Sequence, residues 1–363
     1  MKILKKTIVY VMLLSSVLMY YGFTGHAQER GSRIVPSSEI LKYPDNRPAA
    51  RYRLEAMDQG VVFRHGTGPD SCDYLGARDV WVYESDGTYY MHYDGAGPKG
   101  WLACLATSKD LVSWISQGPV LDFGAKDEDD CASASYGVTY FDGKVWHMFY
   151  LGTPHTSPAP ALIPAFPYLT MKAKSNSPGG PWIKQKDVIP FRTKPGTYYE
   201  ETASPGHVIR FNNQYLMFFS ASMKRTIGIA RTSNLDGPWT IDQSPIVSPE
   251  EQIENSSLYF EPANKTWFLF TNHIGLEGFE YTDAIWVYWT KDLNKWNADH
   301  KAVVLDGRNC SWSSKCIGLP SVLKVGNRLA IIYDAPGGDS KSHMKRDVGL
   351  CWLNLPLRTP ENE

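Results

Sequence analysis

The sequence lacks the features that mark several protein classes. Its formal net charge is −1 over 363 residues, so it has no excess of basic residues of the kind that nucleic-acid binding requires. It contains no Cys-x-x-Cys pair, which argues against a structural zinc site. Beyond residue 23 no apolar run is long enough to span a bilayer. We therefore expect neither a nucleic-acid partner nor a membrane span in the mature chain.

The N-terminus carries the one long apolar run. Lysines at positions 2, 5 and 6 precede apolar residues 8–23, and Ala27 ends a short stretch of small residues. This order is typical of a signal peptide over residues 1–27, and it predicts an exported protein, either periplasmic or secreted. An uncleaved membrane anchor is the alternative, because the run nearly reaches spanning length. No Cys follows the run, so a lipid anchor is not expected.

Cysteine is scarce but even in number. Six cysteines in an exported chain permit disulfides, with 15 full pairings, while buried free thiols are the alternative. Two of them are close enough in the sequence to bridge a single loop, Cys310 and Cys316. The other four are Cys72, Cys104, Cys131 and Cys351.

A unit of short strands recurs along the chain. Each unit has an apolar strand, a tight turn, an aromatic-rich second strand and a Ser/Thr-containing third strand. The turns begin at Asp86, Asp142, Asn212, Asn264 and Gly326. Four third strands end in Trp114, Trp182, Trp239 and Trp296, at spacings of 68, 57 and 57 residues. A period in this range indicates a repeat architecture.

Five such units predict an all-β fold, a five-bladed β-propeller with four-stranded blades around a central channel. The propeller would occupy residues 59–358, after a lead-in segment over residues 28–58 with a short helix near residues 49–57. Two β-sandwich domains are the alternative, but they do not explain the recurring Trp. We interpret these Trp residues as packing between blades. Five prolines in residues 153–167 predict a stiff loop over one end of the channel.

Acidic residues precede the first strand or the turn in several units. In a propeller the first strands line the channel, so these acids converge on one pocket. In three units an acid is followed two and three residues later by Ala or Ser and then Ser. Paired carboxylates are what glycoside hydrolysis needs, one to protonate the leaving oxygen and one to activate water or attack carbon. Each acid alone is more typical of a turn or a cap. The candidates are Asp79, Asp130, Glu200, Glu201 and Glu254.

The repeated phrases resemble those of the five-bladed β-propeller glycosidases, especially glycoside hydrolase family 43 and its relatives. The phrases are Asp-Gly-Thr-Tyr-Tyr-Met from Asp86, Ala-Thr-Ser-Lys-Asp-Leu-Val-Ser-Trp from Ala106, and Ala-Arg-Thr-Ser-Asn-Leu-Asp-Gly-Pro-Trp from Ala230. The likeness covers roughly residues 60–356. It implies an inverting mechanism with three acids, in a divergent member of the same clan.

The resemblance assigns roles to these acids. The family's general base is usually in Asp-Pro at the first strand of the first blade, where Asp79 stands here without the Pro. Asp130 is the candidate for the acid that tunes the pKa of its partner. The family's general acid is a Glu in Glu-Gly-Pro. Glu201 is preferred to Glu200, because Glu201-Thr-Ala-Ser parallels Asp130-Cys-Ala-Ser and because adjacent strand residues point to opposite faces. Arg78, His207 and Glu254 are the predicted sugar contacts.

The resemblance implies an exported, exo-acting glycoside hydrolase that releases a pentose such as β-xylose or α-L-arabinofuranose from a carbohydrate substrate. One alternative is a glycoside phosphorylase of the same clan, which would need a cationic cluster that Arg78 and Arg64 could begin. Another is a non-catalytic glycan-binding propeller. No cofactor is required. Some members hold a calcium or sodium ion in the channel through a His, for which the candidates are His147, His207 and His273. The oligomeric state is not indicated.

Overall fold

The computed structural model describes residues 31–223 and 225–361. Apart from two single-turn 3-10 helices, η1 (Pro69–Ser71) and η2 (Pro249–Glu251), the regular structure in these ranges is strand. The all-β prediction is confirmed. The helix predicted near residues 49–57 is wrong, because this segment forms β2 (Tyr52–Arg53) and the start of β3 (Met57–Phe63). The predicted signal peptide lies outside the described residues. No helix in the described part has the length and apolarity to cross a bilayer.

Most strands fall into antiparallel groups of four that follow the chain. Parallel pairing of Trp101 with Ser133 and of Leu102 with Ala134 joins the first two groups into one eight-stranded sheet. The first group contains β4 (Gly76–Ser85), β5 (Thr88–Gly97), β6 (Gly100–Ser108) and β7 (Trp114–Pro119). The second contains β8 (Ser133–Phe141), β9 (Trp146–Thr153), β12 (Leu169–Ser175) and β13 (Ile183–Lys184). A short hairpin lies between β9 and β12, formed by β10 (His155–Thr156) and β11 (Pro164–Ala165).

Three further groups complete the pattern. The third contains β14 (Val208–Phe211), β15 (Gln214–Ala221), β16 (Thr226–Thr232) and β17 (Thr240–Ile241). The fourth contains β18 (Ile253–Glu261), β19 (Thr266–Gly275), β20 (Tyr281–Thr290) and β21 (Lys301–Leu305). The fifth contains β22 (Ser321–Val325), β23 (Arg328–Ala335) and β24 (Asp347–Asn354), with β3 as its fourth strand.

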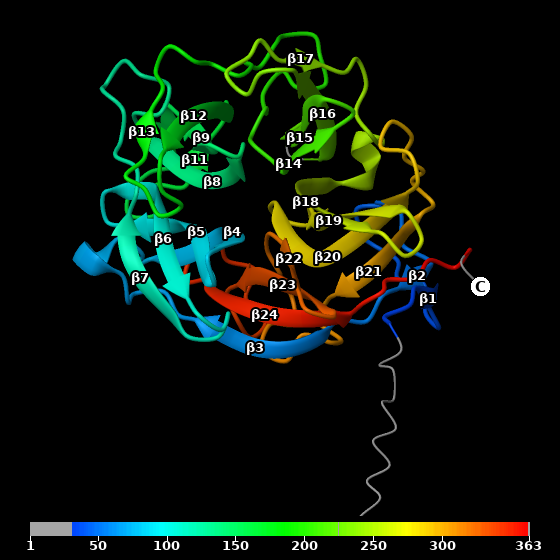
Figure 1. The fold of residues 1–363 in the computed structure, drawn as a ribbon. Helices are drawn as coiled ribbons and strands as arrows, with labels where there is room; N and C mark the ends of the chain where they lie inside the picture. The colour runs from blue at the N-terminus through cyan, green and yellow to red at the C-terminus, as the bar shows by residue number, and fades with distance from the viewer. Residues whose placement is uncertain (1–30, 224, 362–363) are drawn as a thin grey trace, which may run out of the picture. The chain divides into compact units, whose positions relative to one another are not determined.

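The N-terminal part of the chain completes the last sheet. β3 pairs antiparallel with β24, with Val348 opposite Phe63, so a strand from the beginning of the chain lies beside one from its end (Figure 1). β3 begins two residues before the boundary predicted at residue 59. The lead-in also contributes β1 (Val35–Pro36), which pairs with β2, and β2 adds in parallel to β21.

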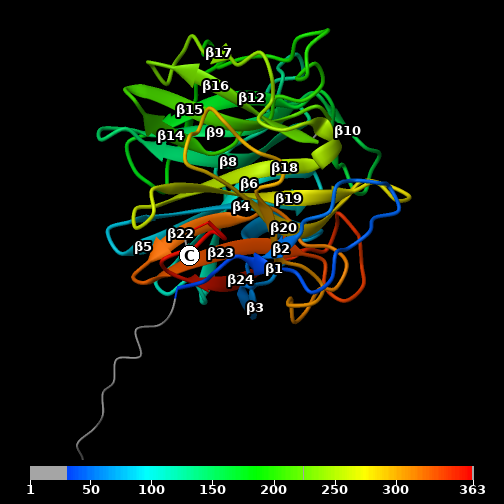
Figure 2. The same cartoon turned by 90° about the vertical axis from the view of Figure 1, so that its right-hand side faces the viewer.

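The groups follow one another in chain order around a common centre (Figure 1), and Figure 2 shows the same sheets from the side. Backbone N–H groups at the start of one group donate to side chains of another. The Val82 N–H donates to Ser321 Oγ at 2.8 Å, and the Val322 N–H to Ser257 Oγ at 2.9 Å. The His207 N–H donates to Ser256 Oγ at 2.9 Å. First strands from different groups are therefore held directly to one another.

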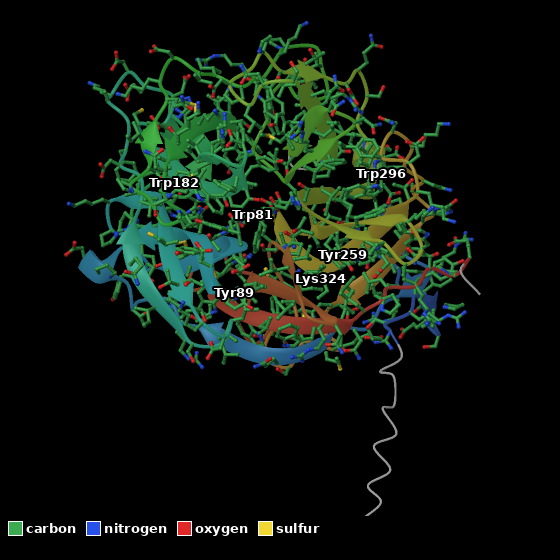
Figure 3. The ribbon with its side chains drawn as sticks, in the orientation of Figure 1. Trp81, Tyr89, Trp182, Tyr259, Trp296 and Lys324 are labelled. Carbon is green, nitrogen blue, oxygen red and sulfur yellow. The ribbon has the colours of Figure 1, made fainter. Side chains whose placement is uncertain are left out.

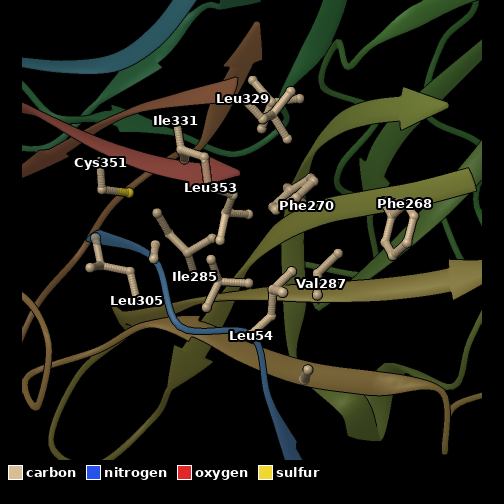
Figure 4. Close-up of a cluster of buried hydrophobic side chains, with 14 of the residues drawn as sticks. Leu54, Phe268, Phe270, Ile285, Val287, Leu305, Leu329, Ile331, Cys351 and Leu353 are labelled. Atoms are coloured by element: carbon tan, nitrogen blue, oxygen red, sulfur yellow. The ribbon is translucent and has the colours of Figure 1, made fainter. Parts of the chain in front are cut away.

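Neighbouring groups pack face to face through apolar side chains, which supplies the main driving force for folding. Figure 4 shows one such cluster, in which Phe268, Phe270 and Ile285 of the fourth group meet Leu329 and Ile331 of the fifth. The clusters also contain two of the repeat tryptophans, Trp182 between the first and second groups and Trp239 between the second and third. In Figure 3 Trp182 and Trp296 lie further from the centre than Trp81. The interpretation of Trp182 and Trp239 as packing residues is confirmed.

All six cysteines are free thiols in this structure. Cys310 and Cys316 do not bridge a loop. Cys310 Sγ lies 3.5 Å from the Tyr333 hydroxyl, and Cys316 Sγ accepts from Arg346 at 2.8 Å. These two thiols therefore face different partners although they are near in sequence.

Candidate active site

A cavity of about 340 Å³ opens where the first strands of three groups begin. β4, β8 and β18 each carry a β-bulge at this end. The bulge holds a non-glycine residue with positive φ in each case, Asp79 (51°), Tyr136 (39°) and Asn255 (62°), and all three line the cavity. A bulge bends its strand and re-aims a side chain. The recurrence of the bulge therefore explains why residues far apart in the sequence reach one cavity.

Positive φ is strained for a side chain as large as that of Tyr136, and such residues persist where the surroundings hold them. The Tyr136 backbone N–H donates to Asp94 Oδ1. Burial raises the pKa of the Tyr136 hydroxyl well above its ordinary value, and the carboxylates of Asp79, Asp94 and Glu254 raise it further. Among the described residues this buried hydroxyl has no hydrogen-bond partner. It is therefore a proton donor that a ligand oxygen in the cavity can satisfy.

Asp79 faces a fixed cation. Its carboxylate lies 3.1 Å from Arg78 Nε, and the Arg78 guanidinium also donates to its second oxygen at 3.2 Å. The Asp79 backbone N–H donates to Asp334 Oδ2 at 2.9 Å, and buried Asp334 accepts from Arg346 at 2.6 Å. Both the strained backbone of Asp79 and its side chain are thus held in place. The side chain keeps 20% of its surface exposed, so it can meet a ligand.

Asp94 is the second carboxyl of the site. It lies on β5 directly opposite Arg78, is 3% exposed and lines the cavity. Burial raises the pKa of Asp94 well above its ordinary value. The charge of Asp79 raises it further, although Arg78 opposes the shift. The Asp94 carboxyl lies close enough to that of Asp79 for the two side chains to interact directly. Burial and the neighbouring charge of Asp79 therefore favour the protonated form of Asp94.

Replacing Asp94 by Asn is expected to change how stability depends on pH. In the wild type Asp94 stays protonated when folded but ionises when unfolded, so it stabilises fully below the unfolded pKa and loses this effect as pH rises towards the folded pKa. An amide mimics the protonated acid at every pH. The free energy of unfolding of Asp94→Asn, relative to wild type, should therefore increase from pH 5 to pH 8, by at most about 1.4 kcal/mol per pH unit. Urea unfolding at the two pH values measures this, and a constant difference would contradict it.

Two more acidic residues line the cavity, Glu254 and Glu280. Glu254 immediately precedes the bulge residue Asn255 and is 2% exposed. His343 connects Arg78 to the backbone at Glu280. Arg78 donates to His343 Nδ1 at 2.9 Å, and Nε2 lies 3.0 Å from the Glu280 carbonyl oxygen. Because Nδ1 accepts from Arg78, Nε2 carries the proton and donates to that carbonyl.

The proline-rich insertion covers one side of the cavity. Residues 157 and 163–166 line it, and Trp101 lies beneath them, with its Nε1–H donating to the Ala161 carbonyl oxygen at 2.8 Å. Phe166 and Tyr168 add aromatic surface, with ring centroids 4.7 Å apart. The loop predicted over one end of the channel thus forms part of the cavity wall. Aromatic rings above paired carboxyls suit a ligand with both apolar faces and hydroxyl groups.

Three of the predicted acids do not join this site. Asp130 is buried elsewhere, where it accepts from Tyr150 Oη at 2.8 Å and from Lys184 Nζ at 2.5 Å. Glu200 and Glu201 are exposed, and Glu200 accepts from the Gly196 N–H at 3.0 Å. None of them lines the cavity. The prediction that they meet Asp79 in one pocket is wrong, because each stands in the loop before its strand.

Of the predicted sugar contacts, Arg78 and Glu254 line the cavity but His207 does not. His207 Nδ1 accepts from the Leu258 N–H at 2.7 Å, and its ring lies 4.8 Å from that of Trp81. Burial lowers the pKa of His207 to about 3, so the ring is neutral. Its partners indicate a residue that joins the third group to the fourth.

His207→Gln is therefore expected to cost stability and to leave ligand affinity unchanged. Losing the acceptor of a buried N–H costs about 1–3 kcal/mol, which chemical denaturation measures. His300→Gln is a matched control, because the His300 side chain is 40% exposed. A weaker affinity with unchanged stability would instead make His207 a ligand contact.

The other histidines considered for a channel ion also have structural partners. His147 Nε2 lies 2.9 Å from Asp142, and the His273 ring stacks on Trp286 at 3.6 Å. In the described ranges, no three side chains of His, Cys, Asp or Glu gather in a way that could hold a metal ion.

Asp94, Tyr136, Glu280 and His343 line the cavity but were not among the candidates from the sequence. Asp94 stands in Tyr-Asp-Gly at the end of a second strand, while the search for acids covered first strands only. The pairing of Arg78 with Asp94 across a hairpin of known turn could have identified it. Glu280 and His343 lie in loops without a recurring pattern.

No family model matches the chain. Its sequence is 44% identical over 110 residues to a 1,2-beta-oligomannan phosphorylase of Thermoanaerobacter sp. (strain X514). The match covers 28% of this chain and 36% of that protein, so the chain spans about a third of this curated relative's length. It leaves most of both chains unmatched.

Solved structures of glycoside hydrolases share the fold. One described as a glycoside hydrolase has a TM-score of 0.64 and is 14% identical, covering 85% of this chain and 96% of that one. A thermostable family-43 glycoside hydrolase has a TM-score of 0.56 and is 14% identical, covering 82% of this chain and 97% of that one. A family 117 glycoside hydrolase of Zobellia galactanivorans has a TM-score of 0.57 and is 14% identical, covering 83% of this chain and 91% of that one. The resemblance to propeller glycosidases is confirmed at the level of fold.

Proposed function

We propose that the protein is an exported glycoside hydrolase and that its five sheet groups are the blades of a β-propeller. The observation that carries the proposal is the carboxyl pair of Asp79 and Asp94, which lines one cavity together with Glu254. Glycosidic cleavage needs carboxyls on both sides of the bond, one protonated and one ionised. A lectin needs neither the pair nor a protonated carboxyl in it.

The geometry supports a distinct role for each acid. Asp79 and Asp94 are neighbours whose side chains interact directly, so they do not flank a glycosidic bond, which needs carboxyls roughly 5–9.5 Å apart. Asp79 is therefore the general base that activates water. Asp94 keeps a proton beside it and orients it, the role that sequence reasoning gave to Asp130. Glu254, which reaches the cavity from β18, is the general acid in place of Glu201.

The cavity suits the end of a glycan. A volume of about 340 Å³ is near the lower limit of roughly 300–1,000 Å³ for small-molecule pockets, and the 157–166 loop closes one side. Both favour exo action on a terminal sugar, such as a pentose. Four carboxyls line the cavity, Asp79, Asp94, Glu254 and Glu280, so a neutral sugar fits this first cavity better than an acidic one.

A phosphorylase of the same clan is the second candidate, because the partial relative is an oligomannan phosphorylase. Phosphate would need several cations. Arg78 is the one Arg or Lys among the cavity-lining residues of the described chain, and it already pairs with Asp79. Arg64, the other predicted cation, is 72% exposed and pairs with Asp347. The charge of the cavity therefore favours water over phosphate as the attacking group.

One experiment separates the two reactions. The purified protein is incubated with nitrophenyl glycosides and with β-1,2-linked mannooligosaccharides, each with and without inorganic phosphate, and the products are identified by NMR. A hydrolase releases free sugar at the same rate in both conditions, and the first anomer seen reports inversion. Dependence on phosphate with formation of a sugar 1-phosphate would instead establish the phosphorylase.

A further inference from the structure

A second cavity of about 380 Å³ lies beside the first. One wall is the N-terminal segment 41–47, and the others come from the fourth and fifth groups. The two cavities share their dividing loops. Glu277 and Tyr281 line the second cavity and Glu280 lines the first, while Lys341 lines the second and His343 the first. Residues next to each other in the sequence, such as Glu280 and Tyr281, therefore line different cavities.

The N-terminal wall is held by buried contacts. Arg47 donates to Asp283 Oδ2 at 2.6 Å, pairs with Asp45 at 3.2 Å, and lies 4.0 Å from the centre of the Tyr43 ring. Asp45 Oδ2 also accepts from the Leu276 N–H at 3.0 Å, which ties this wall to the dividing loop. The cavity is thus built before any ligand arrives, which lowers the entropic cost of binding.

The accessible charge of this cavity is positive, in contrast to the first. Two of its acids form ion pairs with arginines. Asp283 pairs with Arg47, and Asp306 pairs with Arg53 at 2.7 Å. Towards solvent the lining carries Arg308, Lys315 and Lys341. Arg308 lies 3.9 Å from Glu39 and Lys341 lies 4.0 Å from Glu277, so these groups leave an excess of one positive charge.

Tyr281 is an aromatic residue of the lining of the second cavity, and exposed apolar side chains stand on the neighbouring loop. Lys341 Nζ lies 3.9 Å from the centre of the buried Tyr281 ring. On the dividing loop Phe279 is 51% exposed and Leu276 is 39% exposed. Ring faces beside fixed ammonium groups match a sugar that carries an anionic substituent, because the ring contacts its C–H face while the cations bind its charge.

We infer that this second cavity binds an anionic sugar residue, a uronate or a sulfate ester, of the glycan whose neutral end enters the first cavity. That one glycan occupies both cavities rests on the proposed function. The binding of an anionic sugar in the second cavity does not rest on it, because Lys315 and Lys341 lie outside the carboxyl pair and its hydrogen-bond partners. Specificity thus divides between a negative cavity that takes the neutral terminal sugar and a positive one that takes the charged neighbour.

Calorimetric titration tests the binding in an Asp79→Asn background, which prevents turnover. The probes are galacturonate oligomers with their methyl esters, and sulfated galactan oligomers with their desulfated forms. Within one pair, the charged member should bind about tenfold more tightly, and the pair that shows this identifies the substituent. Lys315→Gln with Lys341→Gln should remove that difference. Lys144→Gln with Lys291→Gln makes the same charge change at exposed sites away from the cavity and should not.

Equal affinity for charged and neutral members of both pairs would overturn the inference, as would an unchanged preference in the Lys315/Lys341 variant. Because binding is measured without turnover, these results do not depend on whether the enzyme hydrolyses glycans. If charged oligomers bind but no glycan is cleaved, the proposed function fails and the anionic site stands. If neutral glycosides are cleaved but no charged oligomer is preferred, the proposed function stands and the anionic site fails.

Discussion

Asp79→Asn is expected to lower kcat by about 10³-fold on every substrate that the enzyme cleaves. An amide cannot accept the proton of the attacking water, and loss of a general base typically costs about 10²–10⁴-fold. Asn tolerates the positive φ of this position as Asp does, and its carbonyl oxygen can still accept from Arg78. The fold and the ligand affinity should therefore survive, and kcat and KM from steady-state kinetics separate the two effects.

A matched control is Asp86→Asn. Asp86 has the same φ of 51° but stands in an exposed turn, so this variant tests the cost of the substitution without the site. It should keep wild-type kcat. If Asp79→Asn kept its activity while the melting temperature stayed unchanged, Asp79 would not be the base. A protein that binds glycans equally well in both variants and releases no sugar from any substrate would be a lectin.

The fold was largely predictable because its signal is repeated. Turns such as Asp86-Gly87 and the Trp at the end of the third strands mark the units locally. What local pattern could not show is pairing between distant parts of the chain. β3 completes the fifth group by pairing with β24, almost three hundred residues away, so residues 57 and 58 were read as lead-in. The helix predicted near residues 49–57 failed for the same reason, since β2 obtains its partner from β21.

The site was predictable only in part, because the sequence pattern aligned the wrong positions. The Ala/Ser-Ser phrase placed Asp130 in register with Glu254. The bulges instead place Tyr136 in register with Asn255, which makes Ser135 the equivalent of Glu254. The phrase reflects a structural need, because Ser256 and Ser257 bind backbone N–H groups of other strands.

β-Bulges cannot be located from the spacing of acids and serines, because the extra residue changes the count. Asp79 and Glu254 were predicted because they stand on first strands, and the structure places each within one residue of a bulge. Asp94 was missed because its place depends on the register between β4 and β5. The site is thus set by pairing, which a single sequence encodes only through its turns and its hydrophobic pattern.

Glu254→Gln is expected to slow cleavage according to the leaving group. A general acid protonates the departing oxygen, so its loss matters most when that oxygen is a poor leaving group. For an unactivated oligosaccharide kcat/KM should fall by about 10³-fold. For a dinitrophenyl glycoside, whose leaving group needs no proton, the loss should stay within about tenfold. Measuring kcat/KM for both substrates gives the ratio that defines the role.

Glu280→Gln is the matched comparison, because Glu280 lines the same cavity and carries the same charge. This substitution should lower kcat/KM for both substrates by similar factors. If the dependence on the leaving group appeared in Glu280→Gln and not in Glu254→Gln, the two residues would exchange roles while the reaction stayed the same. If it appeared in neither, the proton would have to come from the Asp79 and Asp94 pair. Glu254 would then activate the water, because the reaction needs one acid and one base on opposite sides of the bond.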